Sequence, residues 1–159
     1  MFLVGDKIVY PMHGAGVIEA IEKRDILGQS REYYVLRMPI GEMRVLVPVG
    51  AIPEAGLRPI VGKDAAAKVF SLLSEEASDE QGNWNRRYRS NMDKLKSGSI
   101  FELAEVVRNM TRRDQQRGLS TTEKKMLDNA RQLLVSELAL VEGLDPQSVI
   151  NKVSECLSA

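Results

Sequence analysis

The chain has 159 residues, of which 43% are hydrophobic, enough to bury a core in one domain or in two small ones. Its 22 basic and 22 acidic side chains cancel, so an anionic partner would have to bind a local patch and not the overall field. A single cysteine excludes an intrachain disulfide. Since no apolar run is long enough to cross a bilayer and no signal-peptide pattern is present, we expect a cytoplasmic protein.

Residues 1–60 are predicted to form a small β-domain. Short runs rich in Val, Ile and Tyr are separated by turn residues and predict strands within residues 2–10, 15–22, 31–38 and 42–49. The turns between them fall at residues 11–14, 27–30 and 39–41. A fifth short strand at residues 57–60 would close the sheet into a small barrel and cover an exposed edge.

Residues 61–159 are predicted to form a second, all-α domain of about five helices. The hydrophobic period becomes helical after Gly62 and predicts helices over about residues 64–73, 84–97, 99–118, 120–142 and 145–157. Capping residues support these starts, namely Asn83, Ser99 with Glu102, Ser120 with Glu123, and Asp145 before Pro146. The acidic stretch 74–82 predicts a loop. The whole chain therefore belongs to the α+β class.

A basic cluster opens the second of these helices. The net charge changes from −4 over residues 74–82 to +4 over residues 83–96, and a second basic run at residues 108–117 sums to +3. The first cluster contains the only tryptophan and three arginines, Trp84, Arg86, Arg87 and Arg89. Guanidinium groups bind phosphates, and a ring beside them can stack on a base or wedge between base steps. This segment predicts contact with a nucleic-acid backbone.

The same residues allow a structural interpretation. An apolar stripe runs along this helix within an arc of about 80°. It consists of Trp84, Tyr88, Met92 and Leu95. Such stripes usually pack into a core, and the arginines on the other sides of the helix would then form a solvated basic face. Because Trp84 lies in the first helical turn, however, its side chain can leave the stripe.

Catalytic chemistry has little support in the sequence. The only histidine, His13, lies in the predicted turn YPMHGAG, and the only cysteine, Cys156, lies near the inner face of the last helix. A structural turn and a packed thiol are the expected roles of these two residues. Zinc and thiol–imidazole sites need clustered ligands, and Gly14 and Gly16 lack the Lys-Ser/Thr pair of a phosphate loop. We expect no enzyme activity, cofactor, metal or small-molecule substrate.

Six segments resemble the CarD family of bacterial transcription regulators, which includes CdnL-type proteins, over essentially the whole chain. They are VGDKIVYPMHGAGVIEAIE, REYYVLRMP, VGKDAAAKVFSLL, NWNRRYRSNMDKLKSG, LAEVVRNMTRRDQQRGLSTTEKKML and ARQLLVSELAL. The resemblance implies a Tudor-like (SH3-like) barrel that docks on the β subunit of RNA polymerase. It also implies a helical domain that contacts promoter DNA at the upstream edge of the melted bubble and stabilises the open complex, without enzyme activity or a cofactor.

The resemblance also implies roles for individual residues. Trp84 matches a ring that wedges into the minor groove at the bubble edge, and the basic positions near the DNA backbone are matched by Arg86, Arg89 and Lys124, with Arg87 adjacent. On the barrel, Arg24 matches a basic residue of the polymerase contact. Some relatives carry a basic residue where this chain has Leu46, while Arg44 lies two positions earlier on the same strand face.

Two other functions remain open at this stage. The chain could be an adaptor that binds RNA polymerase without touching DNA, because the same barrel type occurs in the transcription-repair coupling factor. A free-standing binder of single-stranded nucleic acid is less favoured, since the strands over residues 1–60 carry seven basic and seven acidic residues and no clustered aromatics. We expect a monomer with no membrane contact.

Overall fold

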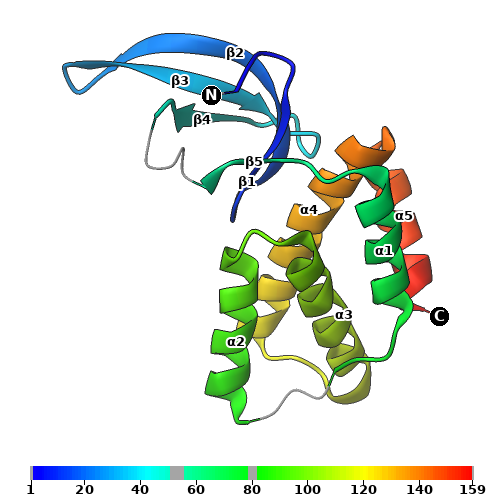
Figure 1. Ribbon diagram of the computed structural model, residues 1–159. Helices are drawn as coiled ribbons and strands as arrows, with labels where there is room; N and C mark the ends of the chain where they lie inside the picture. The colour runs from blue at the N-terminus through cyan, green and yellow to red at the C-terminus, as the bar shows by residue number, and fades with distance from the viewer. Residues whose placement is uncertain (1, 51–55, 79–81, 159) are drawn as a thin grey trace.

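A five-stranded antiparallel sheet precedes five α-helices in the computed structural model, which describes residues 2–50, 56–78 and 82–158 (Figure 1). The strands are β1 (Lys7–Tyr10), β2 (Gly14–Ile26), β3 (Gln29–Arg37), β4 (Arg44–Pro48) and β5 (Arg58–Pro59). The helices are α1 (Lys63–Ser74), α2 (Trp84–Lys96), α3 (Ile100–Arg117), α4 (Thr121–Glu142) and α5 (Pro146–Leu157). The predicted α+β class is confirmed. Residues 79–81 of the predicted acidic loop lie outside the described residues.

The sheet has the strand order β4-β3-β2-β1-β5, so β4 forms one of its edges. The predicted fifth strand is present: β5 pairs with β1 through Ile8 and Pro59 and covers the outer edge of β1. Alternate side chains of the longer strands point to one face, as the period of two requires. They form a small core of their own, built from Ile8, Ile18, Tyr34, Leu36, Met38 and Val47.

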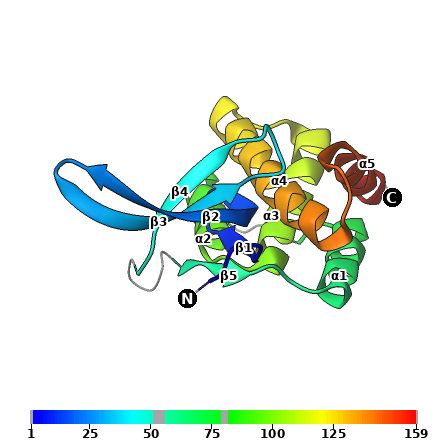
Figure 2. The ribbon, with the colours of Figure 1, turned by 90° about the horizontal axis from the view of Figure 1, so that it is seen from above.

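Strands β2 and β3 form a long hairpin that extends beyond the rest of the sheet (Figures 1 and 2). Ile26 pairs with Gln29, so only Leu27 and Gly28 form the turn. Both have positive φ angles, 53° and 77°, as in the two-residue turns whose twist fits a hairpin. The turn is therefore shorter than the predicted segment 27–30, and both strands are longer.

The helices share a second core to which all five contribute. The predicted capping residues Asn83, Ser99, Ser120 and Asp145 all occupy N-cap positions, and each side chain accepts a backbone N–H from the first turn. Helix α2 is the most lightly anchored by its own side chains, since only Asn91 and Leu95 are buried. Among the described residues, no helix is long and apolar enough to cross a membrane.

The turn between β1 and β2 joins the sheet to α4. The backbone N–H of Ala15 donates to Oγ of Ser136 over 2.9 Å. Gly14 has a φ of 113°, and a Cβ there would lie 2.9 Å from the same hydroxyl oxygen. Only glycine satisfies both the backbone angle and this close approach. Gly14 thus lets the start of β2 approach α4 closely enough for the Ala15 hydrogen bond.

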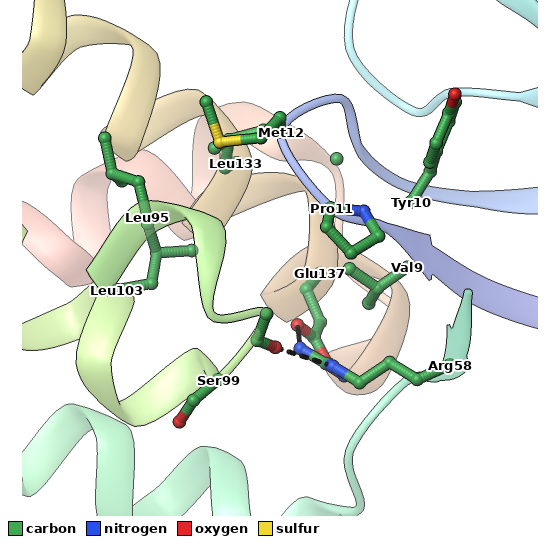
Figure 3. Close-up of a pocket in the computed structure, with 12 residues that line it drawn as sticks. Val9, Tyr10, Pro11, Met12, Arg58, Leu95, Ser99, Leu103, Leu133 and Glu137 are labelled. Carbon is green, nitrogen blue, oxygen red and sulfur yellow. Dashed lines mark hydrogen bonds and ion pairs between the residues drawn. The ribbon is translucent and has the colours of Figure 1, made fainter. Parts of the chain in front are cut away.

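An ion pair also joins the sheet to α4 (Figure 3). Both Nη atoms of Arg58 in β5 donate to the carboxylate of Glu137 in α4 over 2.8 Å. Arg58 Nε donates to the carbonyl of Gly98, and the backbone N–H of Val61 donates to Glu137, which is only 2% exposed. The cavity beside this pair measures about 20 Å³, far below the roughly 300–1,000 Å³ of ligand pockets. It is a packing feature of the junction.

Candidate nucleic-acid interface

The burial of the apolar stripe on helix α2 decreases from the end of the helix to its start. Leu95 is buried, Tyr88 and Met92 are half-buried against the helical core, and Trp84 at the start of the helix is 38% exposed. The helix begins at Trp84 because the Asn83 side chain accepts the backbone N–H of Arg86 over 3.0 Å. The stripe is therefore core at one end and surface at the other.

Two contacts hold the indole of Trp84. Its ring stacks on Tyr88, with 5.2 Å between the ring centroids and 14° between the planes. Its Nε1 donates to Oε1 of Glu123 in the first turn of α4, over 3.0 Å. Because Glu123 precedes Lys124, this hydrogen bond brings Lys124 to the same end of the helical part as Trp84. The sequence predicted the two residues separately and did not predict the contact that joins them.

Arg86 and Arg89 lie on another side of α2. Both are exposed and line a shallow groove, together with Lys94 and the acidic residues Asp93 and Glu102. At 100° per residue they point about 160° and 140° away from Trp84 around the helix. Within the described residues, neither guanidinium forms an ion pair, whereas Lys94 lies 3.2 Å from Glu105. The positive charge at this site therefore comes mainly from the two exposed arginines.

The other predicted basic residues differ in their surroundings. Arg87 is half-buried and its Nη1 donates to the carbonyl of Gly82, so it points toward the protein. Lys124 is exposed on α4. Trp84 therefore has one cation on the α4 side and two on the opposite flank of α2.

The second basic run does not form an open cationic surface. Arg108 is 5% exposed and donates to the carbonyl of Leu72 and to Oγ of Ser78. Arg112 donates to the carbonyls of Leu73, Glu75 and Leu157. Both guanidinium groups thus fasten the end of α1 to α3. The net charge of +3 over residues 108–117 is correct, but a charge sum does not indicate where the side chains point.

On the sheet, Arg24 lies on the projecting hairpin. Its Nη2 donates to Glu22 on the same strand over 2.9 Å, and both side chains are about half-exposed. Directly across the ladder, Arg24 pairs with Arg31. Like charges placed opposite each other on a sheet repel. The hairpin therefore carries two adjacent guanidinium groups, of which the sequence identified only one.

Arg44 begins β4 and forms a two-point ion pair with Glu19. Arg44 Nε lies 2.7 Å from one carboxylate oxygen and Nη2 lies 3.2 Å from the other. Hydrogen bonding to Arg44 lowers the pKa of Glu19, and the same contact raises the pKa of Arg44. Glu19 occupies the point where the register of β2 and β3 shifts, a β-bulge. The sequence did not predict this pair, because it depends on the bulge.

The structure does not bring the three predicted sheet residues into one cluster. Arg24 and Arg44 are separated by the length of β3 from position 31 to position 37, about 20 Å. Leu46 is half-buried on β4 and pairs with Val35. Arg44 lies at the start of the edge strand β4, whereas Arg24 lies on β2 near the tip of the hairpin, beyond the end of β4.

The histidine and the cysteine have structural surroundings. The ring of His13 stacks on Tyr10, with 4.0 Å between the centroids, and its Nδ1 lies 3.1 Å from the carbonyl of Pro11. Cys156 is half-buried against the helical core. These positions agree with the turn role and the packed thiol predicted for them.

An edge strand can accept a strand from a partner, and exposed cations on the same helix as an exposed tryptophan are a feature of nucleic-acid-binding surfaces. Two family models match the chain, the CarD-like/TRCF RID domain over residues 2–61 and the CarD C-terminal domain over residues 68–154. A relative named "Putative transcription factor YdeB", from Bacillus subtilis (strain 168), is 43% identical over 149 residues, which are 94% of this chain and 97% of the relative. The chain therefore belongs to the CarD family and is a transcription regulator. The CarD family is not an enzyme family.

Proposed function

We propose that this protein binds the β subunit of RNA polymerase through its sheet and stabilises the promoter open complex through α2 and the start of α4. Residues 1–60 are the polymerase-interacting domain and residues 61–159 the DNA-contacting domain. The observation that carries the proposal is Trp84, a large ring 38% exposed at the start of a helix, with exposed cations on both sides of it. Promoter DNA at the upstream edge of the bubble is its partner.

The arrangement of α2 and α4 suits a forked duplex. Rings that insert into or stack on nucleic acid need an open face, and the face of Trp84 away from Tyr88 supplies it. A groove has a phosphate backbone on each side, so a ring placed in it needs cations on both flanks. Lys124 is placed for one backbone, and Arg86 and Arg89 for the other. Arg87 supports the helix from the protein side.

The sheet offers an edge for polymerase. Among the described residues, β4 has one hydrogen-bonded neighbour, β3, so its other side can accept a strand from a partner. Arg44 and Leu46 lie on this edge strand, whereas Arg24 lies on β2 near the tip of the hairpin, so a partner that contacts all three residues also reaches the hairpin. The Arg24–Arg31 repulsion would be relieved by an acidic group on the partner.

Tethering explains how a protein of zero net charge can act on DNA. Once the sheet is bound to polymerase, the helices are held at a high local concentration near the promoter, so weak DNA affinity is sufficient. The ion pair between Arg58 and the buried Glu137 joins the helices to the sheet and so influences where they reach.

The alternative is an adaptor that binds polymerase without touching DNA. The exposure of Trp84 favours the first function, and so do Arg86 and Arg89, which have no ion-pair partner among the described residues. An adaptor has no use for a ring stabilised at the surface between cations. The two functions differ in what they require of Trp84, which provides the test.

The experiment measures the decay of competitor-challenged open complexes with Trp84→Ala. A stacked or inserted ring is worth about 1–3 kcal/mol per base, which corresponds to a roughly five- to 150-fold shorter lifetime. Because the ring is only half-buried, we expect its loss to reduce folding stability by about 1–2 kcal/mol, less than for a core tryptophan. Polymerase binding should be retained through the sheet.

Ile150→Ala is the matched control, because Ile150 is a similarly exposed apolar residue, 41%, on α5. It should leave the lifetime unchanged. A Trp84→Ala protein that binds polymerase, folds normally and gives the parent lifetime would establish the adaptor function instead.

A further inference from the structure

The orientation of Trp84 is fixed by a carboxylate that the sequence marks only as a helix cap. Oε1 of Glu123 accepts the indole N–H over 3.0 Å. The same oxygen accepts the backbone N–H of Ser120 over 3.3 Å and its hydroxyl over 3.1 Å. One carboxylate oxygen therefore both caps the start of α4 and accepts the hydrogen bond from the ring at the start of α2.

Glu123 is unusual for a capping residue because it is buried. Capping glutamates lie in the first turn of a helix, where solvent usually reaches them, but Glu123 is 6% exposed. A buried carboxylate is costly unless hydrogen bonds satisfy it, and three donors converge on this one. Its position is therefore strongly determined, which makes it a firm support for the ring.

We propose that Glu123 is a positioning residue for Trp84, holding the indole at the angle in which it meets DNA; this inference rests on the function proposed above. Because Glu123 occupies the indole N–H and Tyr88 covers one face, the ring meets DNA through its remaining face and outer edge. Trp84 then makes no hydrogen bond to a base, and its contact does not depend on base identity through Nε1.

The hydrogen bond also assembles the site from two helices. Helix α2 buries only Asn91 and Leu95 of its own side chains, so its first turn depends on other contacts for a fixed place. The bond to Glu123 joins that turn to the first turn of α4, next to Lys124. Removing the carboxylate should therefore loosen the ring and change its distance from Lys124.

The sole tryptophan makes this contact measurable in the free, full-length protein. We expect Glu123→Ala to make acrylamide quenching of Trp84 fluorescence steeper and to lower its anisotropy, because the ring loses its anchor. Glu123→Gln keeps an acceptor oxygen and should restore both values. Asp145→Ala is the control, since it removes the side-chain cap of α5, whose recorded bonds go to Ser148, and its fluorescence should stay that of the parent.

Open complexes provide the functional measurement. We expect Glu123→Ala to shorten their lifetime by about two- to tenfold, the effect of losing one hydrogen bond that orients the ring. In a Trp84→Phe background the donor is already absent, so Glu123→Ala should shorten the lifetime no further. Additive losses in this cycle would overturn the proposal, because Glu123 would then act independently of the indole.

Two further outcomes would also overturn it. One is unchanged quenching and anisotropy in Glu123→Ala, and the other is the same fluorescence changes in Asp145→Ala, which would trace them to the loss of any helix cap. The fluorescence measurement involves no DNA and separates this proposal from the previous one. If Glu123→Ala loosens the ring while Trp84→Ala leaves the open-complex lifetime intact, the wedge role fails and the anchoring by Glu123 stands.

Discussion

The two parts of the molecule hold their exposed arginines in different ways. On the sheet, Arg24 and Arg44 are paired with Glu22 and Glu19. On α2, Arg86 and Arg89 are exposed, with no ion-pair partner among the described residues. The first pair of arginines is oriented by direct ion pairs, whereas the second pair has Asp93 and Glu102 in the same groove but forms no direct ion pair among the described residues.

This difference fits two kinds of partner. A protein surface presents both signs of charge at fixed positions, so compensated and oriented side chains suit it. A phosphate backbone is a continuous line of negative charge, and binding it releases counterions only where cations are not already neutralised. Direct ion pairing of the arginines therefore distinguishes the proposed polymerase surface from the proposed DNA surface, although the chain as a whole is neutral.

The largest expected effect concerns the junction between the two parts. Arg58→Leu leaves the carboxylate of Glu137, 2% exposed, without its guanidinium partner. Removing one member of a fully buried ion pair typically costs about 3–5 kcal/mol. Because the Arg58 side chain is 28% exposed, the loss of stability in urea unfolding should be large but below that range. Open complexes should also decay faster, because the helices lose their fixed place relative to the sheet.

Replacing both members provides the control for that measurement. A protein with Arg58→Met and Glu137→Met has no uncompensated buried charge and should recover much of the stability. If Arg58→Leu alone unfolds like the parent, Glu137 is not supported by Arg58, and the junction is held by Gly14 and Ser136 instead.

The next effect concerns polymerase binding by the sheet. Arg24→Glu together with Arg44→Glu should weaken binding by about tenfold or more, since like charges at a docked surface repel, while the circular dichroism spectrum stays unchanged. An exchange of Glu19→Arg with Arg44→Glu keeps the ion pair but reverses its direction. If the exchanged protein still binds polymerase, the ion pair shapes the surface and the partner does not recognise the sign of the charge at either position.

Local rules were sufficient for much of this structure. The capping residues Asn83 and Ser120 act within one helical turn, so the sequence located both helix starts correctly. The change from period two to a helical period gave the α+β class. The graded stripe on α2 also follows from spacing, because a residue in the first turn has few core neighbours.

Other features depend on residues that are distant in the chain. Glu123 meets Trp84 across 39 positions, and Arg58 meets Glu137 across 79. Each glutamate alone has an ordinary local interpretation, as a cap or as a solvated side chain. Arg108 and Arg112 were counted as a basic run because a charge sum does not include direction. The fold had to be known before these contacts could be assigned.

A smaller effect is expected for the cations of α2. Each phosphate neutralised on duplex DNA contributes about 0.9 to the slope of log affinity against log salt. Arg86→Ala with Arg89→Ala should therefore lower this slope by roughly one to two units in the polymerase complex, and act nearly alike on all promoter sequences. A loss confined to one sequence would indicate base readout instead.

The matched control for these arginines removes the same charge elsewhere. Lys63→Ala with Lys68→Ala takes two exposed cations from α1, which lies on the other side of the helical part from α2 (Figure 1). The slope should then stay that of the parent. Equal reductions in both double variants would mean that DNA responds to the net charge of the protein and not to the α2 surface.

The smallest effect concerns the ion pair of Glu19 and Arg44. Hydrogen bonding to Arg44 lowers the pKa of Glu19, so the folded state holds its carboxylate charged to a lower pH than the unfolded chain does. The resulting stabilisation is present above the unfolded pKa of about 4.3 and is lost as the pH falls through the lower, folded value. Glu19→Gln should therefore flatten the pH dependence of urea unfolding between about pH 5 and pH 3. The change should be small because both groups are exposed.

Arg44→Met provides the control and should flatten the pH dependence of unfolding over the same interval, since it removes the cause of the pKa shift of Glu19. A steep pH dependence in either variant would assign the acid sensitivity to other carboxylates. The ion pair would then have only its role in shaping the β4 edge.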